Sequence, residues 1–116
     1  MRWTLRITSA LHLAGVLGQA LLAGLFVTGD ADLLSSHEGN AGVTHSLLYV
    51  QLVVAFLFWR RRRVAWPLWA TAGLVAAETL QIWAGIERNL GVHFPLGMAI
   101  FGGSAVVTLA LWKVTR

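Results

Sequence analysis

Histidine is the residue type in this chain best suited to hold a metal-containing cofactor, and two of its histidines occupy similar positions. His93 lies at the start of the last apolar segment, with Gly97 four residues later. His37 opens an earlier apolar segment, and Ala41 follows it at the same spacing. Neutral imidazole is a common metal ligand, and residues four apart share one face of a helix. The pattern predicts two imidazole ligands for one flat cofactor, with a small residue beside each to leave room for its ring.

The composition places these histidines in an integral membrane protein. Of the 116 residues, 57% are hydrophobic and 12% are charged, whereas soluble domains carry about 25% charged residues. There is no cysteine, which excludes disulfides, thiolate metal sites and covalently attached haem but leaves non-covalent haem open. The net charge of +4 comes from basic residues at segment ends without an aromatic-interleaved patch, so nucleic acid is not an expected partner.

Four apolar segments predict an all-α fold, a four-transmembrane-helix bundle with up-down-up-down topology. We expect helices over about 7–28, 36–59, 64–86 and 92–112. Each segment has about the 20 residues that a helix needs to cross the hydrocarbon, and the links between them are short, as in antiparallel bundles. The whole chain, 1–116, is therefore expected to form a single integral membrane domain in the lipid bilayer.

The charged residues predict the orientation of this bundle. Both chain ends and the run at 60–63 are basic and fall on one side, which the positive-inside rule assigns to the cytoplasm. We therefore expect a bacterial cytoplasmic (inner) membrane protein with cytoplasmic N- and C-termini. The residues expected on the outer side are mostly acidic, with one cation among them: Asp30, Asp32, Glu38, Glu87 and Arg88.

Local signals place both histidines at helix starts. Ser35 and Glu38 have the spacing of a capping box, which predicts that the second helix begins beside them. Pro95 is tolerated in the first turn of a helix, which predicts the start of the fourth helix just before it. His37 and His93 are thus expected in or beside a first helical turn near the outer face.

A histidine pair can be selected by depth. At about 1.5 Å per residue, His37 and His93 lie roughly 34 and 30 Å from the basic residues that close their helices, and His45 lies roughly 22 Å away. We therefore favour His37 with His93 as the ligands of a haem iron and keep His45 with His93 as the alternative. Haem propionates would find Arg88 as the cation on that side of the membrane.

A second polar layer is expected below this site. Gln19, His45 and Glu78 fall at similar depth, and polar groups there must face inward and pair. The layer is either a structural hydrogen-bond network or a proton path or quinone contact below the cofactor, with Glu38 as a further candidate. His12 lies nearer the cytoplasmic end and is interpreted as an interfacial histidine.

Three short motifs carry a resemblance to a known family. They are the Gln-x-x-x-Ala-Gly that begins at Gln19, the His-Glu at His37 and the His-x-Pro-Leu-Gly that begins at His93. With them the chain resembles small four-helix bacterial membrane proteins related to one half of a haem A synthase. The resemblance implies haem ligation by a second-helix histidine, here His37 or His45, and by His93. In one half of that family a functional glutamate precedes the second-helix histidine, a role Glu38 could fill for His45.

These observations predict a haem b-binding, cytochrome b-like membrane protein that transfers electrons or handles haem near the outer face through bis-histidine ligation. A homodimer, a larger membrane complex and a quinone are its candidate partners. Two alternatives belong to other classes. One is a non-catalytic accessory subunit of a larger respiratory complex. The other is a small proton-coupled transporter that uses Glu78 as its membrane carboxylate.

Overall fold

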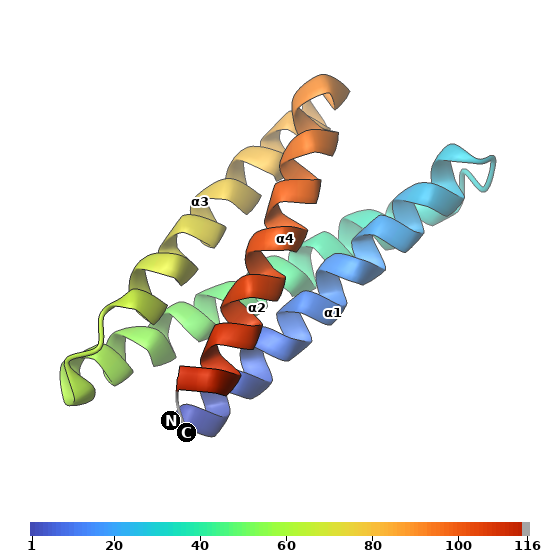
Figure 1. The fold of residues 1–116 in the computed structure, drawn as a ribbon. Helices are drawn as coiled ribbons and strands as arrows, with labels where there is room; N and C mark the ends of the chain where they lie inside the picture. The colour runs from blue at the N-terminus through green and yellow to red at the C-terminus, as the bar shows by residue number, and fades with distance from the viewer. Residues whose placement is uncertain (115–116) are drawn as a thin grey trace.

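The computed structural model describes residues 1–114, which form four α-helices and no strand (Figure 1). Helix α1 packs against α2 and α4, and α3 packs against the same two helices, so α1 and α3, like α2 and α4, are diagonal. The predicted all-α bundle with up-down-up-down topology is therefore confirmed. The helix bounds are Arg2–Val27 for α1, Leu33–Arg62 for α2, Trp66–Ile86 for α3 and Leu90–Val114 for α4.

The start of α2 differs from the prediction. The helix begins at Leu33, and no side chain caps its first turn. The hydroxyl of Ser35 donates to the carbonyl of Asp32 at 3.2 Å, so the predicted capping box is wrong. The chain turns at Gly29, whose φ of +126° is accessible to glycine, and the N–H of Leu33 already donates to the carbonyl of Asp30. The backbone turn that follows Gly29 therefore begins the helix at Leu33 without a side-chain cap.

The connection between α3 and α4 is a short turn between Ile86 and Leu90. Arg88 adopts a left-handed backbone with φ of 56°, and the N–H of Asn89 returns to the carbonyl of Ala84 at 2.8 Å. Helix α4 then starts at Leu90, so Pro95 lies inside it rather than in its first turn. The predicted start was late because the prediction places proline in the first turn, where a helix N–H has no partner to lose. Here Pro95 lies in the second turn, and the helix tolerates the absence of its hydrogen bond to the preceding turn.

Three helices are long and apolar enough to cross a membrane: α1, α2 and the stretch Leu90–Lys113 of α4. Helix α3 has 21 residues, and Glu78 and Gln81 lower its hydropathy. The span predicted over 64–86 therefore stays a prediction, as do the inner-membrane location and the cytoplasmic termini.

The bundle is tied together at the end that holds the chain termini. There Arg6 donates to the carbonyls of Leu111 and Trp112, each at 3.4 Å, and its guanidinium lies about 5 Å from the rings of Trp3 and Trp112. The Arg6 side chain thus donates hydrogen bonds to carbonyl groups in the last turn of α4, where backbone carbonyls lack partners within the helix. The packed apolar core lies in the same half of the bundle and consists of Leu5, Leu48, Ala55, Phe58, Leu74, Val107 and Leu111.

At the opposite end the side-chain hydrogen bonds join helices of the same hairpin. Asn40 on α2 donates to the carbonyl of Gly15 at 2.9 Å and to the amide oxygen of Gln19 at 2.8 Å, both on α1. His93 on α4 bonds to the carbonyl of Gln81 on α3. The α1–α2 and α3–α4 hairpins diverge toward this end (Figure 1). We call it the open end, and the end with the termini the closed end.

Gly15 lets the two helices of the first hairpin approach closely. A Cβ there would lie 2.5 Å from the hydroxyl of Thr44, whereas a Cβ at Gly18 would make only ordinary contact with Asn40. We expect Gly15→Ala to lower the free energy of unfolding by about 1–3 kcal/mol through overpacking. Gly18→Ala should change it by less than about 1 kcal/mol.

Reversible unfolding in detergent micelles would measure both changes. Because the Thr44 hydroxyl has no hydrogen-bond partner within residues 1–114, Thr44→Ala in the Gly15→Ala background should restore most of the lost stability. Equal losses in the two glycine variants would contradict this account of the α1–α2 contact.

Candidate functional site

The structure brings His37 and His93 together, as the sequence predicts. Their ring centroids lie 6.2 Å apart with an interplanar angle of 65°, and the two side chains come from the diagonal helices α2 and α4. An imidazole nitrogen binds a metal at about 2.0–2.1 Å, so two ligands on opposite sides of one ion place their ring centres roughly 6 Å apart. The observed separation of the ring centroids would leave room for one metal ion between the two imidazoles.

The ring of His93 is held in a defined orientation. Its Nδ1–H donates to the carbonyl of Gln81 at 2.8 Å, which leaves Nε2 with a free lone pair, as in metal-binding histidines. The ring lies directly over Gly85, where a Cβ would come within 2.9 Å of the His93 Cε1 atom. Gly85 therefore provides the space in which His93 reaches the Gln81 carbonyl.

His37 has a buried ring nitrogen without a partner. Its imidazole lies near the backbone of Gln19 on α1, and its Nδ1 makes no hydrogen bond among the described residues. A buried polar atom without a partner costs free energy. This unpaired nitrogen belongs to a ring whose centroid lies 6.2 Å from that of His93 across the bundle axis, so His37 is a candidate ligand.

A cavity of about 660 Å³ surrounds the two rings, within the 300–1,000 Å³ typical of ligand pockets. Ala41 and Gly97 line it as expected, although the space beside Gly97 is occupied by the Gln81 amide, 3.0 Å from where a Cβ would stand. All four helices contribute to the wall, and Gln19, Gln81 and Glu78 add polar groups to it.

Other predicted site residues lie elsewhere. His45 and Glu38 are not among the residues that line the cavity, so the structure does not bring His45 to His93. Arg88 is exposed in the α3–α4 turn and also stands outside the lining. Gln19 reaches the cavity but pairs with Asn40 rather than with the predicted layer of His45 and Glu78.

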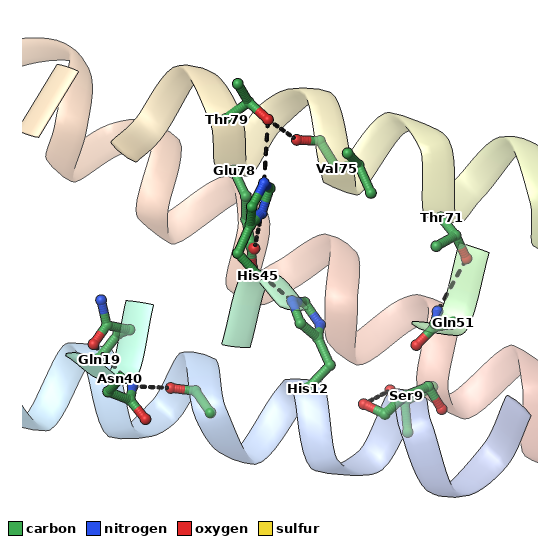
Figure 2. Close-up of polar contacts among 12 residues, drawn as sticks. Ser9, His12, Gln19, Asn40, His45, Gln51, Thr71, Val75, Glu78 and Thr79 are labelled. Carbon is green, nitrogen blue, oxygen red and sulfur yellow. Dashed lines mark hydrogen bonds and ion pairs between the residues drawn. The ribbon is translucent and has the colours of Figure 1, made fainter. Parts of the chain in front are cut away.

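A second polar cluster lies toward the closed end, centred on Glu78 (Figure 2). Its Oε1 is 2.6 Å from Nε2 of His12 on α1, and its Oε2 is 2.9 Å from Nδ1 of His45 on α2. His12 is only 1% exposed, so its interpretation as an interfacial histidine is wrong. Counting residues along one helix could not show that side chains of the diagonal helices α1 and α3 meet across the bundle axis at this level. The signal for the contact was Glu78 itself, because a carboxyl in a membrane helix requires partners.

The hydrogen-bond directions in this cluster can be assigned in part. The hydroxyl of Thr79 donates to the carbonyl of Val75 at 2.8 Å, so in its 3.4 Å contact with Nε2 of His45 the ring is the available donor. We expect one further proton between His45 and Glu78 and another between His12 and Glu78. This arrangement would give the cluster no net charge, which suits burial in a membrane helix.

Comparisons with protein-family models, curated proteins and solved structures find no match. Among residues 1–114, no group of three or more histidine, aspartate and glutamate side chains is arranged to hold a metal ion. A metal at the His37–His93 pair must therefore bring further ligands of its own, as the iron of a haem does.

The neutral cluster predicts how Glu78 can be replaced. In Glu78→Gln, the amide can accept from His12 and donate to Nδ1 of His45, so every contact is kept without a charge. We expect this variant to lose less than about 1.5 kcal/mol of unfolding free energy. Glu78→Leu has a similar volume but leaves both rings unpaired, and we expect it to lose about 3–5 kcal/mol.

Unfolding titrations of the two variants beside the wild type would test this expectation. A glutamine variant as unstable as the leucine variant would show that the negative charge of Glu78, rather than its hydrogen bonds, holds the cluster together.

Proposed function

We propose that this protein binds haem b between His37 and His93 and serves in electron transfer or haem handling within a membrane. The observation that carries the proposal is the 6.2 Å separation of two imidazoles from diagonal helices, both lining one cavity. The unpaired Nδ1 of His37 and the Gln81 carbonyl that orients His93 support the same assignment.

The roles of the residues follow from their contacts. His37 and His93 would hold the haem iron, one from each hairpin, and the Gln81 carbonyl would orient His93. A haem held in this way would supply one-electron redox chemistry. Because two histidines would hold the iron, the site favours electron transfer over oxygen chemistry. The apolar wall around it controls solvent access and hence the reduction potential.

The resemblance to one half of a haem A synthase agrees with this assignment and remains part of the proposal. So does the position of the site near the outer face, where Arg88 is the cation available to propionates. A quinone, a second copy of the chain or a larger membrane complex is the proposed partner for the electron.

One observation favours a second candidate function, that of a small proton-coupled transporter. Glu78 lines the same cavity as the two histidines while it shares protons with His12 and His45. A carboxyl that faces both a cavity and a proton-holding cluster is what coupled transport requires. This candidate needs proton-linked uptake that Glu78→Gln abolishes, and it needs no haem.

The haem assignment is tested by replacing the ligands. After haem supplementation, purified wild-type protein should show a reduced-minus-oxidised spectrum of six-coordinate haem b. His37→Ala and His93→Ala should each lower the bound haem more than tenfold, because each removes an axial ligand. His45→Asn should retain the haem, because an amide can replace the imidazole as a donor to Glu78. Wild-type protein without a Soret band would end the proposal, and loss in His45→Asn with retention in His37→Ala would support the alternative pair.

The support beneath His93 can be tested separately. In Gly85→Ala the new methyl group would meet the His93 ring at about 2.9 Å, so the ring should leave the Gln81 carbonyl. We expect haem affinity to fall by about 10–100-fold, as for lost outer contacts of metal ligands. Gly73→Ala on the same helix meets nothing within 4 Å and is the control. Equal affinity in both variants would argue against His93 as a ligand in this orientation.

A further inference from the structure

We propose that the cavity exchanges its ligand directly with the hydrocarbon of the bilayer, through an opening between α1 and α4 at the open end. This inference rests on the proposed haem function and adds the route by which the haem enters and leaves. It follows from which walls of the cavity are joined, which are apart and what chemistry their edges present.

Helices α2 and α3 are joined where His45 contacts Glu78, which lines the cavity, at 2.9 Å. A second bond between them, from Gln51 to Thr71 at 3.0 Å, lies in the closed half (Figure 2). Helices α1 and α4 are linked by side-chain hydrogen bonds at the closed end, where Thr108 donates to the carbonyl of Ser9 at 3.2 Å. Toward the open end the two hairpins diverge (Figure 1).

The residues where the cavity meets the surface are apolar. Leu17 on α1 is 52% exposed, and Met98 and Phe101 on α4 are 76% and 41% exposed, yet all three line the cavity. We call these three residues, together with Gly24 of α1, the rim. Both helices that carry the rim are long and apolar enough to cross a membrane, so the rim faces lipid in the spanning orientation.

The four rim residues carry no polar side chain, whereas polar side chains line the rest of the cavity. They come from all four helices: Gln19 from α1, His37 from α2, Gln81 and Glu78 from α3, and His93 from α4. A ligand that fits must carry a coordinating or polar region inward and present apolar surface outward. A flat amphipathic macrocycle dissolved in the bilayer meets both conditions and can pass edge-on between two helices, whereas an aqueous route would require crossing the apolar rim.

Two rim positions allow the opening to be narrowed without disturbing the fold. A Cβ at Gly24 meets nothing within 4 Å, so Gly24→Trp places its ring at the opening, and Met98→Trp does so from α4. Matched controls lie off the cavity: Gly42 on α2 also has nothing within 4 Å of a Cβ, and Val106 on α4 is 66% exposed. Gly42→Trp and Val106→Trp therefore add the same bulk away from the rim.

The experiment measures loading and release of haem b by the reconstituted full-length protein. Phosphatidylcholine vesicles that contain haem b serve as donor, apomyoglobin in excess serves as acceptor, and Soret absorbance reports both rates. A residue at an entrance changes entry and exit by the same factor and leaves the affinity unchanged. We expect Gly24→Trp and Met98→Trp to slow both rates at least tenfold at unchanged affinity. Both control variants should stay within twofold of the wild type.

Each other outcome has a definite meaning. Unchanged rates in both rim variants, or a lowered affinity without slower entry and exit, would overturn the proposed route while leaving haem binding intact. Equal slowing in the control variants would also overturn it. Wild-type protein that takes up no haem from the vesicles or from solution would instead defeat the proposed function. If Gly24→Trp fails to fold, Met98→Trp carries the test, because its side chain already projects from the surface.

Discussion

The carboxyl group of Glu78 is the constraint on which the rest of this structure depends. It is 5% exposed in a bundle whose other helices are apolar enough to span a membrane, and a group of this kind is costly there unless it is paired. Its partners, His12 and His45, come from α1 and α2. The contact therefore joins one hairpin to the other and determines the level at which they cross.

The bundle is packed differently on the two sides of the Glu78 contact with His12 and His45. On one side of it lie the packed core, the Gln51–Thr71 bond and the guanidinium of Arg6 at the end of α4. On the other side the hydrogen bonds of Asn40 and His93 stay within their own hairpins, and a cavity opens between them. A ligand that binds His37 and His93 would supply, at the open end, the link between hairpins that Glu78 supplies deeper in the bundle.

The small residues of the chain acquire distinct meanings in this arrangement. Gly15 lets α1 approach Thr44, and Gly85 makes room for the ring of His93. Gly24 and Gly42 have open space where a side chain would begin. The sequence does not distinguish the roles of these four glycines, since glycine is common at helix contacts in membranes. Only the positions of the neighbouring helices separate a glycine that packs from one that leaves an opening.

The sequence by itself determined the architecture, and it favoured the histidine pair while leaving His45 as an alternative to His37. Segment length and hydropathy depend on residues close together in the chain, so they predict four helices in antiparallel order directly, and helical rise placed His37 and His93 at similar depths. Only the tertiary structure decided which side chains meet across the axis. It placed His12 in the core beside Glu78 and Gln19 against Asn40, whereas the contact of His45 with Glu78 agrees with the polar layer predicted from the sequence. These outcomes depend on the crossing and rotation of the helices, which packing between distant segments sets and which no local pattern in the sequence records.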